Sequence, residues 1–261
     1  MQRATTALAL AALALCPRVA SAFDPFEIQV YDATANKRGA AGLELHLNRF
    51  ATGRQGTEPP ELPLHGQTHA TFEPSYGVTD WWELGGYFQT TLREGGGFDY
   101  AGVKLRSKLV TPPDFHRYLR LGVNVELALL PEAYDRHRWG GEIRPMAAWE
   151  QAGWFLAVNP IVGLSFTGDG LSEGPSFEPA IKASRELLGV VAVGCEYYGG
   201  LGPIAHPAAL ADQEHLLFGV LDLAAFPAIE VNLGLGGGLT PASSGLVGKV
   251  ILGVTWERLG K

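Results

Sequence analysis

The feature that most constrains the fold is a two-residue hydrophobic period that recurs along most of the chain. From Leu119 to Leu129 every second residue is Leu or Val, and the residues between them are Arg, Gly, Asn, Glu and Ala. The same alternation marks 42–48, 228–235 and 249–257. A two-residue period places alternate side chains on opposite faces of a β-strand, whereas a helix requires a period of 3.6 residues. The pattern therefore predicts an all-β protein.

About twelve segments show this pattern, with turn-forming residues between them. They lie at 39–50, 66–77, 81–92, 98–110, 118–130, 139–150, 153–164, 175–186, 188–199, 213–225, 228–238 and 247–258. A thirteenth apolar stretch, 26–33, precedes them. Because closed bacterial barrels have even strand counts, we interpret residues 23–38 as an N-terminal lead-in or plug segment and residues 39–261 as the barrel.

The predicted connections alternate between short and long. Four tight turns (78–80, 151–152, 185–187 and 226–227) alternate with four long loops (51–65, 131–138, 165–174 and 200–212). Membrane barrels sort their connections in this way, with short periplasmic turns and longer external loops. The connections 93–97 and 111–117 fit the rule less well. Together these features predict a transmembrane antiparallel up-and-down β-barrel of about twelve strands, with a soluble periplasmic β-protein as the alternative.

The first 22 residues have the layout of a secretory signal peptide. Arg3 supplies a positive charge, residues 7–15 contain only Ala and Leu, and Ala20-Ser21-Ala22 fits the cleavage pattern. The apolar run is much shorter than the ~20 residues that a membrane-spanning helix needs. We therefore predict a cleaved signal peptide at 1–22 and export to the outer membrane of a Gram-negative bacterium. Lipid attachment at Cys16 is the alternative.

Composition excludes several other classes of protein. Removing residues 1–22 takes away two arginines and no acid, so the formal net charge moves from −7 to −9. An acidic chain with scattered Lys and Arg lacks the basic patch of a nucleic-acid-binding protein. Only Cys195 would remain, so no internal disulfide can form. The best candidate for a membrane helix, 216–226, is interrupted by Asp222.

Five tryptophans share the apolar parity of their strands and lie near strand ends. Trp82, Trp149, Trp154 and Trp256 fall at the end with tight turns, and Trp139 falls at the opposite end. Amphipathic rings at headgroup depth form the aromatic girdles of membrane barrels. We therefore assign these five residues to the membrane interface, with a set of core tryptophans as the alternative.

The opposite parity carries much of the charge. In a membrane barrel this parity must point into the lumen, because lipid cannot solvate it. The predicted lumen-lining residues are Glu73, Glu83, Lys104, Arg106, Lys108, Glu126, Glu142, Arg144, Asn159, Glu178 and Lys182.

Two expectations concern contacts inside this lumen. Lys104, Arg106 and Lys108 lie on one parity of one strand and predict a basic ladder that would favour anions. The alternative is that inward carboxylates pair with all three and merely make the barrel rigid. The hairpin through Gln151 should also set Arg144 about opposite Asn159.

The sequence carries no recognisable catalytic or metal-binding motif. Its seven histidines are scattered, and His65 and His69 are four residues apart, a spacing that gathers ligands on a helix but not on a strand. A Gly-x-Ser-x-Gly motif, a phosphate-binding loop and the His-x-Ser-Asn-Gly signature of outer-membrane phospholipases are all missing. We therefore expect no enzyme, no bound metal and no cofactor.

Three segments carry a resemblance to a known family. Residues 27–32, 42–48 and 73–81 look like uncharacterised proteobacterial outer-membrane barrels, and Tyr-Gly-Val-Thr-Asp at 76–80 is similar to a turn in the outer-membrane family linked to meta-pathway phenol degradation. The resemblance implies a barrel that transports small organic molecules. The sequence departs from many membrane barrels at its C-terminus. Many barrels end on an aromatic residue that the insertion machinery recognises, whereas here five residues follow Trp256.

Function is thus expected to be that of a passive channel or transporter for small organic molecules. A non-conducting barrel with a structural, anchoring or surface-binding role is the alternative, because twelve strands leave only a modest lumen once side chains fill it. The expected partners are outer-membrane lipid, the barrel-insertion machinery and a small-molecule substrate. No nucleic-acid partner is expected.

Overall fold

The computed structural model describes residues 24–55, 57, 59–168, 170–187, 189–226 and 228–257. The predicted signal peptide lies outside these described residues. No helix within them has the length and apolar character needed to cross a membrane.

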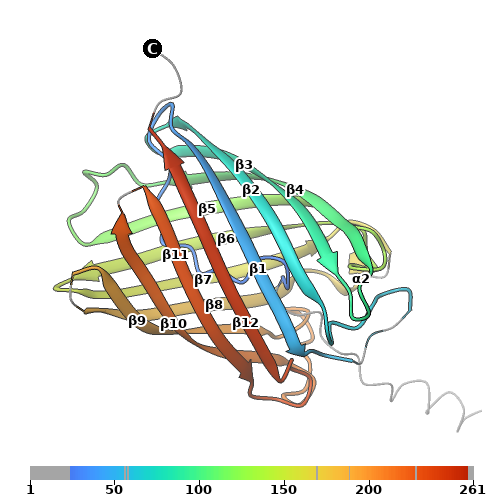
Figure 1. Ribbon diagram of the computed structural model, residues 1–261. Coiled ribbons are helices and arrows are strands. Elements are labelled where there is room, and N and C mark those ends of the chain that lie inside the picture. The colour runs from blue at the N-terminus through green and yellow to red at the C-terminus, as the bar shows by residue number, and fades with distance from the viewer. Residues whose placement is uncertain are drawn as a thin grey trace, which may run out of the picture.

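Twelve antiparallel strands form one closed barrel, in which each strand pairs with its neighbours in sequence and β1 pairs with β12 (Figure 1). This confirms the predicted fold class. The strands are β1 (Ala41–Thr52), β2 (Thr68–Thr79), β3 (Trp82–Leu92), β4 (Phe98–Val110), β5 (Leu119–Leu129), β6 (Trp139–Gln151), β7 (Trp154–Ser165), β8 (Ser176–Leu187), β9 (Val191–Gly200), β10 (Glu214–Phe226), β11 (Ile229–Gly238) and β12 (Leu246–Trp256). A short helix, α2 (Gly170–Glu173), lies between β7 and β8.

The two-residue period separates the outer wall from the interior. In β5 the outward side chains of Val125 and Leu127 are 43% and 54% exposed, whereas Asn124 and Glu126 between them are 0% and 2% exposed. The outer wall is therefore apolar and the inner wall carries the polar groups. Closure also leaves no strand edge with unpaired main-chain groups, which is the condition for crossing a hydrocarbon layer with strands.

Turn chemistry fixes the register of the hairpin between β6 and β7. Ala152 and Gly153 have φ values of 52° and 77°, as the two central residues of a type I′ turn require. Gln151 pairs with Trp154, and Ile143 pairs with Val162. This register puts Asn159 two residues away from the position opposite Arg144, so the expectation that these side chains lie opposite each other is wrong by two positions.

The extended N-terminal stretch Asp24–Ala33 lies inside the barrel, and we call it the plug. Figure 1 shows it in blue, behind the front strands. Ile28 and Val30 of the plug belong to one buried apolar cluster with Leu216, Phe218 and Val220. The inner wall is thus apolar in the middle of β10, between Glu214 and Asp222, a feature that the general expectation of a polar lumen did not include.

The two faces of β5 predict opposite responses to an introduced cation. Val125→Arg should lower the free energy of unfolding by about 2–4 kcal/mol in lipid, the cost of a cation facing the middle of a bilayer. Ala128→Arg should cost less, because Ala128 lines an internal cavity beside Glu126 and Glu142. Urea unfolding of both variants in vesicles is the measurement. Equal costs would contradict the assignment of the two faces.

Candidate functional site: the lumen and its plug

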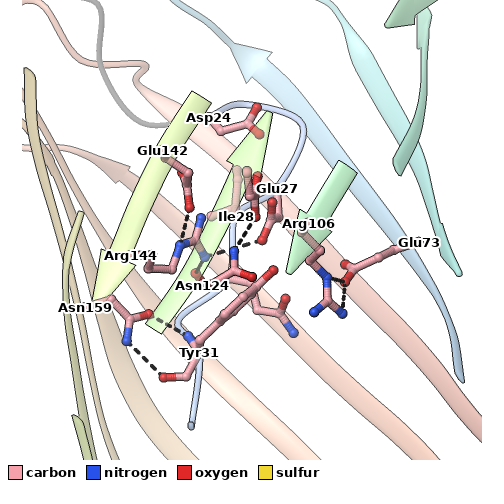
Figure 2. Close-up of polar contacts among 12 residues, drawn as sticks. Asp24, Glu27, Ile28, Tyr31, Glu73, Arg106, Asn124, Glu142, Arg144 and Asn159 are labelled. Atoms are coloured by element: carbon pink, nitrogen blue, oxygen red, sulfur yellow. Dashed lines mark hydrogen bonds and ion pairs between the residues drawn. The ribbon is translucent and has the colours of Figure 1, made fainter. Parts of the chain in front are cut away.

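The main chain of the plug is held by side chains of the wall. Asn159 of β7 is fully buried, its Oδ1 accepts a hydrogen bond from the Tyr31 amide at 2.7 Å, and its Nδ2 donates to the Tyr31 carbonyl at 3.0 Å (Figure 2). One side-chain amide therefore satisfies both main-chain groups of Tyr31, as a neighbouring strand would. A buried plug without such partners would leave these groups unpaired at a cost of about 1–3 kcal/mol each.

Other strands hold the plug in the same way. The Lys249 ammonium of β12 donates to the Ile28 carbonyl at 2.9 Å. The Thr71 hydroxyl of β2 donates to the Phe26 carbonyl at 3.1 Å, and the Phe26 ring stacks on His69 with centroids 4.1 Å apart. The plug is therefore anchored on several sides of the barrel and not along one strand.

The Tyr31 side chain sits at the centre of this arrangement. The Arg144 guanidinium lies 4.3 Å from the centroid of its ring, a distance typical of a cation–π contact. Its hydroxyl is 2.6 Å from the Tyr87 hydroxyl, which donates to Glu126 at 3.0 Å. A chain of hydrogen bonds thus runs from the plug to β3 and β5.

Arg144 also links the plug to the wall through charge. Its Nε donates to Glu142 at 2.6 Å, and its Nη1 lies 3.3 Å from Glu27 of the plug. Arg144 and Glu27 are 2% and 0% exposed at the side chain. In such a buried setting, removal of one partner leaves the other charge buried and unpaired, which lowers the free energy of unfolding by about 3–5 kcal/mol.

The three cations expected to form a basic ladder are each paired with carboxylates. Lys104 forms ion pairs with Asp24 of the plug and, at 3.2 Å, with Glu126. Arg106 lies 2.6 Å from Glu73 and 2.7 Å from Glu83, and Lys108 lies 3.0 Å from Glu83. The structure therefore favours the alternative of paired, rigidifying charges, and it removes the basis for expecting an anion preference from this strand.

The remaining predicted lumen residues occupy two further places. Lys182 of β8 lies 2.8 Å from Asp222 and 3.2 Å from Glu196. Glu178 accepts a hydrogen bond from the Ser176 hydroxyl at 2.6 Å and lines a cavity near the loops. Lys249 and Glu196, which were not among the predicted residues, form a buried ion pair. The alternation of the sequence could have predicted that both side chains point inward, but it could not predict that Glu196 of β9 pairs with Lys249 of β12.

A second arrangement missed by the sequence analysis surrounds His46 of β1. Its Nε2 lies 3.0 Å from Glu73 and 3.5 Å from Glu44, and the histidine is fully buried. Glu44 and Glu73 are cross-strand partners, which explains why the cluster cannot be found from spacing along the chain. Their ligand atoms lie within 4.8 Å of one another, as the ligands of a metal ion would. Since Glu73 already binds Arg106, we interpret the cluster as part of the ion-pair network.

The five predicted interface tryptophans lie on or near the outer wall. Four of them, Trp139, Trp149, Trp154 and Trp256, are between 37% and 53% exposed. Trp82 is half-buried, and its indole N–H donates to the Ser107 hydroxyl at 3.0 Å.

The plug divides the lumen into two cavities. The larger, of about 1030 Å³, lies at the end with long loops and is lined by Phe26 of the plug together with loop residues such as Glu61 and Tyr134. The smaller, of about 420 Å³, lies at the turn end and is lined by Gln29 and Tyr31. Burial raises the pKa of the Glu61 carboxyl, and the nearby Arg54 offsets this only in part.

Comparison with solved structures identifies the architecture. An outer membrane channel from Pseudomonas putida F1 is similar with a TM-score of 0.59 and 12% sequence identity, over 88% of this chain and 100% of that one. The KdgM porin is similar with a TM-score of 0.52 and 8% identity, over 84% of this chain and 99% of that one. At these identities the likeness shows the fold alone, a closed β-barrel that this chain shares with both proteins.

No protein-family model matches the sequence, and no curated protein sequence matches it. The resemblance to the family linked to meta-pathway phenol degradation therefore stays a prediction.

The buried ion pair between Arg144 of the wall and Glu27 of the plug should contribute to stability. Arg144→Met should lower the free energy of unfolding by about 3–5 kcal/mol, because Glu27 and Glu142 would lose their buried partner. Lys37→Met is the matched control, since Lys37 pairs with Glu257 at 3.6 Å with both side chains more than four-fifths exposed. The control should lose at most about 1 kcal/mol. If denaturant titration shows that Arg144→Met loses as little stability as Lys37→Met, the plug contacts contribute little.

Proposed function

We propose that this protein is an outer-membrane channel for small organic molecules whose lumen is occupied at rest by its own N-terminal plug. The observation that carries the proposal is the pair of cavities, about 1030 Å³ and 420 Å³, separated by one extended segment. The similarity to channel and porin barrels supports the same proposal.

The plug is attached in a way that permits movement. Its residues are held by side-chain hydrogen bonds and ion pairs, whereas each wall strand is held by a ladder of main-chain hydrogen bonds along its length. Displacement of the plug would therefore leave the ladder of the barrel unbroken. Passage would follow when the segment near Phe26–Tyr31 moves aside and joins the two cavities.

A non-conducting barrel is the second candidate, and the depth of the plug contacts favours it. Glu27, Ile28 and Tyr31 are all buried, and the plug carboxylates Asp24 and Glu27 balance the wall cations Lys104 and Arg144. A plug that supplies counter-charges to the wall would be costly to displace. Conductance measurements distinguish the two candidates.

The substrate class follows from the resemblance in the sequence and from the mixed lining of the cavities. Apolar residues such as Leu62, Leu64 and Leu130 line the larger cavity beside its carboxylates. Small organic molecules with both apolar and polar parts fit such a lining. Polar groups of the lumen such as those of Asn159, Lys249 and Arg144 hold the plug, and we propose no catalytic role for them.

Location is the first test. The apolar outer wall predicts that the mature protein fractionates with the outer membrane and migrates faster on a detergent gel before boiling than after it, since closed barrels resist unfolding by detergent. Recovery in the soluble periplasmic fraction without detergent would rule out the proposal.

Single-channel recording in planar bilayers tests the role of the plug. Asn159→Ala removes two hydrogen bonds to Tyr31, worth together about 1–3 kcal/mol, and should raise the ratio of conducting to closed time roughly 5- to 150-fold. Asn232→Ala is the control, because Asn232 is an equally buried inward residue that donates to Asp222 of the wall. An absence of conductance in both the wild-type protein and the folded Asn159→Ala variant would support the non-conducting barrel.

A further inference from the structure

The cavity at the loop end has an unbalanced charge. Its lining contains nine carboxylates but only three Lys or Arg residues, which are Arg54, Lys104 and Arg136. Two histidines line it as well. An enclosed space with walls of one dominant charge concentrates ions of the opposite charge.

The three cations are already engaged by part of this acidic set. Lys104 pairs with Asp24 and Glu126, and Arg54 lies 3.4 Å from Glu61. Arg136 lies 3.9 Å from Glu173. Within the described part of the chain, no salt bridge to a cation involves Glu178, Asp212 or Glu214. The cavity therefore keeps an excess of carboxylates after its own cations are counted.

Glu214 gives an independent indication of a ligand. It begins β10, lines the cavity and is 2% exposed. Its Oε1 is buried and has no hydrogen-bond partner among the described residues. Buried carboxylate oxygens in folded proteins are ordinarily hydrogen-bonded, so an unpartnered one at a cavity wall marks a place for a donor.

The rest of the lining is apolar and aromatic. Phe26 and Tyr134 lie with their ring centroids 5.8 Å apart, and Leu62, Leu64 and Leu130 also line the cavity. Aromatic rings attract cations and also pack against apolar groups. This combination suits an ammonium group attached to an apolar body better than it suits a bare metal ion.

We propose that the loop-end cavity is a binding site for small organic cations, with Glu214 accepting hydrogen bonds from the ligand ammonium and the aromatic and leucine side chains holding its apolar part. The inference deepens the proposed function, since it names the charge class of the molecules that would enter from the loop end. Binding itself requires no movement of the plug, so it can be tested apart from conductance.

Calorimetric titration of the full-length protein in detergent micelles is the test, with benzylamine, benzyl alcohol and benzoate as probes that share one ring and differ in charge. Empty micelles give the blank for partitioning. Benzylamine should bind at least about tenfold more tightly than benzyl alcohol, because charge-assisted hydrogen bonds are the stronger ones. Benzoate should bind more weakly than both. Equal affinities for the three probes would overturn the proposal.

Two variants locate the site. Glu214→Gln keeps the shape of the side chain and should weaken benzylamine binding roughly tenfold or more, as expected for loss of a hydrogen bond to a charged group. Glu132→Gln is the control, because Glu132 is an exposed residue of the same loop end that does not line the cavity. If Glu214→Gln fails to fold, Asp212→Asn replaces it as the test variant. Asp212 is another lining carboxylate without a salt bridge among the described residues, and its replacement should also weaken benzylamine binding.

Unchanged affinity in the folded cavity variants would overturn the site. The two proposals fail separately. Benzylamine binding without any conductance would remove the channel and keep the cation site, whereas conductance without selective benzylamine binding would keep the channel and remove the cation site.

Discussion

The rest of the structure depends on the hydrogen-bonded closure of the barrel. β1 and β12 pair from Ala41 and Trp256 at one end to Thr52 and Leu246 at the other, so no strand keeps an open edge. Main-chain amides and carbonyls cannot find partners in hydrocarbon, and closure is the way in which strands satisfy all of them. Closure also gives every strand an inner and an outer face. With an apolar outer face, the charged side chains of the strands have to lie inside.

Charges placed inside a narrow barrel must find partners at short range. Lys104 and Arg144 meet this requirement with Glu126 and Glu142 of the wall, and also with Asp24 and Glu27 of the plug. The plug is therefore part of the charge balance of the lumen as well as a steric obstacle. Its apolar residues complete the interior in the same way, because Ile28 and Val30 cover the apolar inner side of β10.

Local features of this fold follow from short stretches of sequence, whereas its ion pairs depend on residues far apart in the chain. The period of two residues predicted the strands and the faces of residues such as Val125 and Asn124, because alternation is a property of each strand alone. A tight turn at 151–152 was also predicted locally, but its central residues in the structure are Ala152 and Gly153, one position later. The sequence left open whether Lys104, Arg106 and Lys108 form a free basic ladder or pair with carboxylates, because the partners of these cations come from other strands and from the plug.

The sequence by itself determined that this chain forms an all-β barrel with one apolar and one polar face, since strand alternation and turn chemistry act over a few residues. Only the tertiary structure decided where the plug lies, which carboxylate pairs with which cation, and where the two cavities remain. Those features depend on residues such as Asn159 and Tyr31, or Glu27 and Arg144, that are more than a hundred positions apart in the chain. Barrel closure and register bring them together, and no local pattern encodes a distance of that kind.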